Sequence, residues 1–120
     1  MELVEDKHTS NFIIKRYSSN TIFFANDKYV KPIIFYCDTI SIFSISHPSK
    51  IRIHDIEKYL STVSVILIGT GERSILLNET LIYNMQTKNK GLEFMNTESA
   101  CKTHNLLLSE KRSFASILYP

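Results

Sequence analysis

The strongest constraint on the fold is an alternation of strand and helix patterns in the second half of the chain. Residues 63–68 (VSVILI) are apolar at five of six positions, which is typical of a central strand covered on both faces. The elements that follow are a helix at 78–90, a strand at 91–95, a helix capped by Asn96 or Thr97, and a strand at 113–119. This order predicts right-handed crossovers and a largely parallel sheet.

Both predicted helices carry capping signals and apolar faces. Asn78 is the expected N-cap of the first helix, and Gly91 is the expected left-handed residue that ends it. The second helix has an inward stripe made of Ala100, Cys101, His104, Leu107 and Leu108. These faces need an apolar surface to cover them, so both helices should pack on the sheet.

The first half of the chain predicts short strands. β-Branched and aromatic runs occur at 12–14, 22–24, 29–30 and 33–36, with turns expected at 18–20 and 25–27. Residues 39–45 form a further strand or an extended loop, and a short helix is expected at 55–60. An antiparallel front end of this kind makes the whole sheet mixed. We expect residues 1–120, of which 43% are hydrophobic, to form a single domain.

Composition argues against several classes of function. Fourteen Lys and Arg against twelve Asp and Glu give a net charge of +2, which announces no basic face for nucleic acid. Cys37 and Cys101 lie far apart, so neither a disulfide framework nor a zinc site is expected. The acidic residues 1–8 lack signal-peptide features, and no apolar run approaches the roughly twenty residues that a bilayer demands. We therefore expect a cytoplasmic protein without membrane insertion.

Several motifs, taken in order, resemble a known family. They are Gly69-Thr70-Gly71 after the buried strand, Gly91 opening the next strand, 95–97 (MNT), 100–105 (ACKTHN), 110–112 (EKR) and 117–120 (ILYP). Together they resemble a small uncharacterised bacterial and archaeal domain family. Its eukaryotic relatives include respiratory complex I assembly factor 3 and the adipogenesis-associated domain protein. The family often has Trp near Phe43, Arg in place of Lys102, and Tyr or Phe in place of His104.

The resemblance implies an α/β fold of three layers. It implies a mixed, partly parallel central sheet and a small accessory antiparallel β layer. It also implies no established enzymatic activity and no cofactor.

The first candidate site is the turn at Gly69, Thr70, Gly71 and Arg73. Ligands in open α/β sheets gather at the carboxyl ends of parallel strands, and the two glycines could form a nest of N–H groups for an anion. The complete dinucleotide fingerprint and the P-loop lysine are both missing. A tight strand-exit turn with positive φ at the glycines explains the same residues, and we favour it.

The second candidate site is Cys101 with Thr103, His104 and Asn105. Cys101 and His104 are three residues apart on the predicted helix, so a thiolate and an imidazole could meet. A helical Cys on an apolar stripe is more often a small, buried and unreactive side chain. Thr103 and Asn105 are expected to bond backbone groups and fix the helix against the glycine turn. His47, His54 and Asp55 match no compact ligand pattern, so no metal site is expected.

No catalytic set emerges, and the aromatic residues point to partners. Some of Tyr17, Phe23, Tyr29 and Tyr119 are expected to form an exposed patch, of which a homodimer interface is the simplest use. Our leading hypothesis is a non-enzymatic, cytoplasmic protein-interaction or assembly-type module with unknown protein partners. The alternative is a binder of a small anionic ligand, or a weak hydrolase, with a pocket between the turn at 69–73 and the helix at 101–105.

Overall fold

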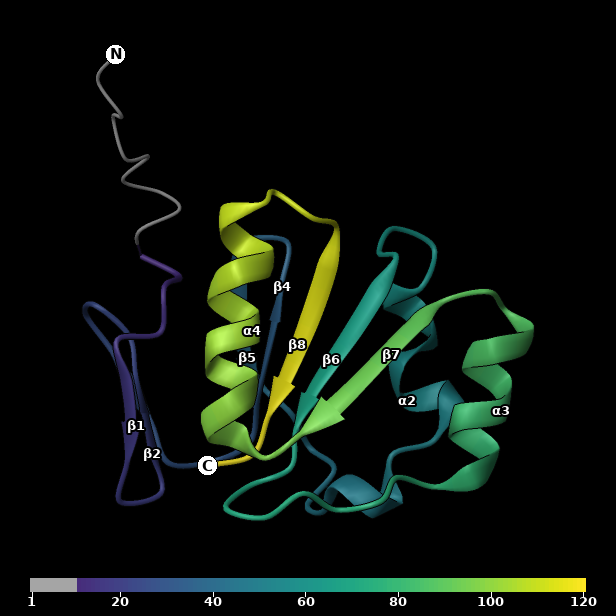
Figure 1. The fold of residues 1–120 in the computed structure, drawn as a ribbon, viewed down its shortest axis with the longest axis horizontal. Coiled ribbons are helices and arrows are strands. Elements are labelled where there is room, and N and C mark those ends of the chain that lie inside the picture. Colours follow the sequence, from purple (N-terminus) through teal and green to yellow (C-terminus); the bar gives the residue numbers. More distant parts are fainter. Residues whose placement is uncertain (1–10) are drawn as a thin grey trace.

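The structure, a computed structural model, describes residues 11–120. The expectation drawn from residues 1–8, that no signal peptide is present, falls outside the described residues. A central sheet has the strand order β5 (Thr39–Ile42), β4 (Ile33–Tyr36), β8 (Phe114–Leu118), β6 (Val65–Gly69) and β7 (Gly91–Met95) (Figure 1). Strand β6 runs parallel to both β7 and β8, whereas β4 is antiparallel to β8 and β5. The predicted mixed, partly parallel sheet is confirmed.

A second, smaller sheet precedes the central one. It contains β1 (Arg16–Ser18), β2 (Thr21–Phe23) and β3 (Lys28–Tyr29), all antiparallel. The predicted strand at 12–14 is wrong, because pairing begins only at Arg16. The predicted turn is correct: Ser19 and Asn20 both have positive φ, as a two-residue hairpin with right-handed strand twist requires.

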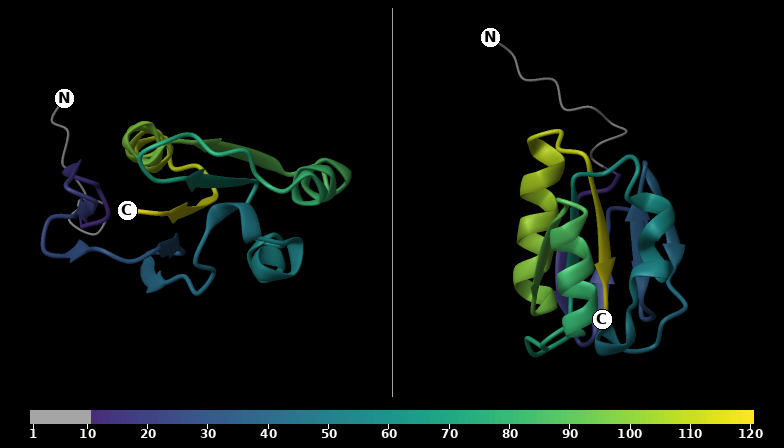
Figure 2. Two further views of the ribbon diagram at one scale, coloured as in Figure 1. Left: turned by 90° about the horizontal axis from the view of Figure 1, so that it is seen from below. Right: turned by 90° about the vertical axis from the view of Figure 1, so that its right-hand side faces the viewer.

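The helices lie on the two faces of the central sheet. They are α2 (Ile53–Ile56), α3 (Glu79–Thr87) and α4 (Thr97–Ser109), with 3₁₀ turns at Pro48–Lys50 and Glu57–Tyr59. Helix α4 and the small sheet cover one face, and α2 and α3 pack with the apolar side chains of the other (Figure 2). The three-layer α/β architecture is thus confirmed. The continuous helix expected at 55–60 is instead the short helix α2 followed by a 3₁₀ turn.

The predicted helix caps are correct, but one predicted helix stop is wrong. The Asn78 side chain accepts from the amide of Thr80, and that of Asn96 accepts from Ser99, so both are N-caps. Gly91 is not the left-handed stop of α3, because Asn89 takes that role with φ of 57°. The Lys90 amide donates to the Met85 carbonyl around it, and Asn tolerates this conformation better than most residues.

The β4–β5 hairpin is also tighter than its sequence suggests. Tyr36 pairs with Thr39, which leaves only Cys37 and Asp38 in the turn, and both have positive φ. Such a turn favours Asn and Gly, so Cys37 is an unusual occupant. The strand prediction within 39–45 is confirmed at Thr39–Ile42.

Candidate functional site

The carboxyl ends of the three parallel strands meet at Thr97, the first residue of α4. Its hydroxyl donates to the Tyr119 carbonyl at 2.6 Å and accepts from the Gly71 amide at 2.8 Å. The Thr97 amide in turn donates to the Gly71 carbonyl at 2.8 Å. Helix α4 therefore begins beside the glycine turn, as the crossover topology predicts.

The glycine turn makes hydrogen bonds within itself and packs directly against the start of α4. A Cβ on Gly69 would lie 2.9 Å from the Ala100 Cβ, so Gly69 permits the close approach of α4 to β6. Only Gly71 has positive φ, at 98°, so the expectation of positive φ at both glycines is wrong for Gly69. The Thr70 hydroxyl donates within the turn, with the Arg73 carbonyl at 2.6 Å. The Gly71 amide bonds Thr97, so it is not directed at a ligand, and the tight-turn interpretation accounts for this segment.

His104 is fully buried on α4 among aromatic rings. Its Nε2 lies 2.8 Å from the Phe12 carbonyl oxygen and its Nδ1 lies 2.8 Å from the Ser116 hydroxyl. A carbonyl only accepts, so Nε2 carries the proton and Nδ1 accepts from Ser116 in the neutral ring. The edges and faces of Phe35 and Phe114 surround it. Burial lowers the pKa of His104 to about 4, opposed by the hydrogen bond to Phe12.

Cys101 lies one turn earlier on α4 and is also buried. Desolvation, together with the nearby Glu98 carboxylate, raises the pKa of its thiol to about 12. Both nitrogens of His104 are already bonded to other groups, so the ring is not free to take a proton from the thiol. The geometry therefore favours the unreactive interpretation of this pair.

Asn105 connects α4 to the small sheet. Its side-chain oxygen accepts from the Ile14 amide at 2.8 Å, and its side-chain nitrogen donates to the Ile14 carbonyl at 2.9 Å. The Thr103 hydroxyl lies 3.4 Å from the Met95 sulfur. The expectation that Asn105 bonds backbone groups is confirmed, but neither Thr103 nor Asn105 fixes the helix against the glycine turn, because Thr97 does so. A cavity of about 280 Å³ that includes Cys101 and Asn105 contains no residue of 69–73.

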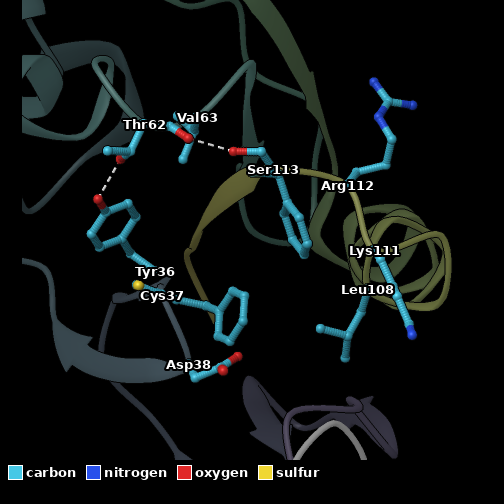
Figure 3. Close-up of a pocket in the computed structure, with 11 residues that line it drawn as sticks. Tyr36, Cys37, Asp38, Thr62, Val63, Leu108, Lys111, Arg112 and Ser113 are labelled. Atoms are coloured by element: carbon cyan, nitrogen blue, oxygen red, sulfur yellow. Dashed lines mark hydrogen bonds between the residues drawn. The ribbon is translucent and has the colours of Figure 1, made fainter.

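A larger cavity, of about 320 Å³, lies at the opposite end of the sheet (Figure 3). Its apolar lining comes from Phe35, Val63, Leu108 and Phe114. Tyr36 and Cys37 face Leu108 and Lys111 across it, and the Tyr36 hydroxyl bonds that of Thr62. The amino ends of β6 and β8 and the carboxyl end of α4 enclose this space.

Charged residues and unusual backbone surround this cavity. Lys111 and Arg112 lie on one side and Asp38 on another. Cys37, Asp38 and Lys111 all have left-handed backbone, which for residues other than Gly costs of order 1 kcal/mol or more each. Sequence reasoning missed this site and treated Lys111 and Arg112 as solvated turn residues. One signal in the sequence could have indicated the tight turn at this site. The strand patterns at 33–36 and 39–42 leave room for only two residues between them.

None of the four residues named for the expected aromatic patch is fully exposed. Tyr119 is wrong as a member, because it is buried and its hydroxyl donates to the Ile45 carbonyl at 2.7 Å. Tyr17, Phe23 and Tyr29 are half-buried. In the part of the chain that the structure describes, the exposed large apolar side chains are Val30, Ile42, Leu76, Tyr83 and Leu106.

Within residues 11–120, no helix is long and apolar enough to cross a bilayer. The same range contains no cluster of three His, Cys, Asp or Glu side chains arranged to hold a metal ion.

Comparison with known proteins gives the family. The family described as "Protein of unknown function (DUF498/DUF598)" matches residues 14–119. The chain belongs to this family. The relationship expected from the motifs in the second half of the sequence is thereby confirmed.

Two relatives match most of this chain. One is the "13 kDa major membrane protein" of Francisella tularensis subsp. holarctica, 29% identical over 98% of each chain. Another is the NADH dehydrogenase (ubiquinone) 1 alpha subcomplex assembly factor 3 of Xenopus tropicalis, 29% identical over 89% of this chain. This match spans 60% of the frog protein, which is therefore the longer of the two.

Solved structures share the fold. An outer membrane protein from Bartonella henselae superimposes with a TM-score of 0.77 at 28% identity, over 89% of this chain and 92% of that one. A Xanthomonas campestris protein reaches 0.82 at 21% identity, over 99% and 92%. The second likeness shows the fold alone. The expected cytoplasmic location stays a prediction.

Proposed function

We propose that this chain is a non-enzymatic, cytoplasmic protein-interaction or assembly-type module. The observation that carries the proposal is the contrast between its reactive and its exposed residues. Cys101 and His104 are buried and committed to structural contacts, whereas Ile42 on the edge strand β5 is 59% exposed. An exposed apolar side chain on an edge strand is more consistent with pairing to a protein partner than with chemistry.

The relatives and the charge support the same proposal. The name of the frog relative describes an assembly factor, and the net charge of +2 provides no strong attraction for nucleic acid. A homodimer is one form that such an interaction module can take.

Affinity capture from the native cell tests this proposal. The tagged full-length chain should retain a specific protein in a stoichiometric amount, and Ile42→Lys should release it. Leu106→Lys, at another exposed apolar position, is the matched control and should retain it. Turnover of thioesters or phosphate esters that is lost in Cys101→Ala would instead contradict the non-enzymatic proposal.

A binder of small anions is the second candidate, and the larger cavity favours it. Phe35 and Phe114 offer an apolar lining, and Lys111 and Arg112 offer positive charge beside it. Pockets of this composition hold an apolar body and orient its charged group. Unlike the pocket expected from sequence, this one lies away from the turn at 69–73 and from Cys101.

Titration with benzoate and phenyl phosphate tests the second candidate. Amide NMR shifts should change around Phe114 and Lys111, and the double variant Lys111→Gln, Arg112→Gln should weaken binding. The double variant Lys28→Gln, Lys88→Gln is the control, because it removes the same two positive charges at exposed positions outside the cavity. Shifts that are absent, or that persist in the double variant, would remove this candidate.

A further inference from the structure

Within residues 11–120, the outer edge of β5 pairs with no other strand. In the β4–β5 ladder Tyr36 pairs with Thr39 across a two-residue turn, which makes this a hydrogen-bonded pair. The ladder continues to the Phe43 amide, which donates to the Pro32 carbonyl at 2.9 Å. Because alternate residues of an antiparallel strand face its neighbour, Thr39, Ser41 and Phe43 bond β4. The N–H and C=O groups of the residues between them, Ile40 and Ile42, therefore point away from the sheet.

The sequence of this edge lacks the usual protection against pairing. Residues 39–46 (TISIFSIS) contain no Lys, Arg, Asp, Glu, Pro or Gly. Sheet edges in natural proteins are normally protected by charges, Pro, bulges or a covering element. The opposite edge strand, β7, shows this protection, because Glu93 is exposed in the middle of it. The β5 edge thus lacks the protection that the β7 edge has. This difference indicates that the β5 edge is covered in the functioning protein.

We propose that two copies of this chain pair antiparallel through β5, about a two-fold axis at Ser41, to form one continuous sheet. The inference deepens the proposed function, on which it rests, by naming a partner and a surface. In this register Ile40 lies opposite Ile42 of the second copy, and Ile42 lies opposite its Ile40. The outward N–H and C=O groups of both residues then form four backbone hydrogen bonds across the axis.

Side-chain placement favours this register. Ile40 packs against the core shared with α4 and the small sheet, and Ile42, two residues on, projects from the same face. Pairing therefore covers the exposed Ile42 with Ile40 of the second copy. The closest approach falls at the axis, where small Ser41 side chains meet, and no like charges oppose each other along 39–46.

The contact is small, which sets the expected strength. One four-residue strand on each side buries less than the roughly 1,200 Å² of a standard interface. The dissociation constant for self-association should therefore lie in the micromolar range. Backbone hydrogen bonds contribute to the binding free energy, and few side chains are needed.

Sedimentation velocity of the full-length chain tests the pairing. From low micromolar to several hundred micromolar concentration, the mass should rise from 13.9 kDa toward twice that value. Ile42→Lys should raise the dissociation constant roughly tenfold or more, because it adds like charges beside the axis. Leu106→Lys makes the same change on α4 and should leave the dissociation constant unaltered. A wild-type chain that stays monomeric, or Ile42→Lys that associates normally, overturns the inference.

Amide hydrogen exchange provides a second readout that needs no variant. The amides of Ile40 and Ile42 should exchange more slowly as the concentration rises. The Ser41 amide, already bonded to β4, should change little and is the internal control. Concentration-dependent protection confined to other segments would overturn the inference. A monomer that still captures a cellular partner would reject this pairing and leave the proposed function standing. Association through β5 together with Cys101-dependent turnover would support the pairing and reject the non-enzymatic proposal.

Discussion

His104 donates from Nε2 to the carbonyl oxygen of Phe12 at 2.8 Å and so ties the middle of α4 to the segment that leads into the small sheet. The contact requires a proton on Nε2. The cationic ring carries this proton, and so does the neutral ring when Nδ1 is the acceptor. Burial favours the neutral form, because the low-dielectric interior penalises charge. The aromatic neighbours Phe35 and Phe114 add contact area without offering a counter-charge.

We predict that His104 makes the protein sensitive to acid. Its pKa in the folded state, about 4, is below the ordinary histidine value of 6.5, so unfolding takes up a proton as the pH falls between these values. The free energy of unfolding should decrease by about 3 kcal/mol from pH 7 to pH 4 through this residue alone. Urea unfolding across this pH range measures the decrease.

The variant His104→Phe should lack this part of the pH dependence. It should also be less stable at pH 7, because the Ser116 hydroxyl and the Phe12 carbonyl lose the hydrogen bonds that they make to the ring. His54→Gln, at an exposed position on α2, is the control and should keep the wild-type slope. An unchanged slope in His104→Phe would show that other groups cause the acid sensitivity.

Thr97→Val should be strongly destabilising. The substitution keeps the volume of the side chain but removes the hydroxyl from between the Gly71 amide and the Tyr119 carbonyl. Buried groups without a partner cost roughly 1–3 kcal/mol each, so we expect a total loss of about 3 kcal/mol. Thermal or urea unfolding measures it. Thr97→Ser retains the hydroxyl and should lose much less, and equal losses in the two variants would refute this explanation.

Asn105→Leu should loosen the small sheet without unfolding the central one. Both hydrogen bonds to Ile14 disappear, and its amide and carbonyl lose these partners. Amide exchange should accelerate across β1 and β2 while β6 and β8 remain protected. Uniform acceleration across both sheets would instead show that the two layers unfold together.

Lys111→Gly should stabilise the protein. Lys111 ends α4 with φ of 55°, where a side chain is disfavoured and Gly is not, and its amide still donates to the Leu108 carbonyl. The expected gain is about 1 kcal/mol in the free energy of unfolding. Lys88→Gly, one residue before the left-handed Asn89, should be destabilising by comparison, since Lys88 has ordinary helical backbone. A loss of stability in Lys111→Gly would mean that this side chain contributes to packing around the cavity.

The elements that sequence predicted well have local causes. The buried run at 63–68 and the caps Asn78 and Asn96 depend on neighbours within a few residues, so their patterns are visible in one dimension. The prediction that Gly91 ends α3 was wrong because Asn89, two residues earlier, also adopts the left-handed conformation that ends a helix.

The contacts that sequence missed are between distant segments. His104 bonds Phe12, and the larger cavity joins Tyr36 to Ser113, and neither pairing leaves a periodic or spaced signal. The apolar stripe on α4 predicted that Cys101 and His104 lie in the core. It did not predict the hydrogen-bond partners of the His104 ring nitrogens. The register of the strands, rather than the secondary-structure propensity of each residue, determines these contacts.

Thiol modification measured against pH tests most directly whether Cys101 and His104 are structural rather than catalytic. In the Cys37→Ser variant only Cys101 remains, and we predict that it stays unmodified by iodoacetamide at neutral pH and reacts only when the protein unfolds. In the Cys101→Ala variant the exposed Cys37 should react readily under the same conditions. Rapid modification of Cys101 in the folded protein, with a midpoint near or below pH 7, would contradict the account.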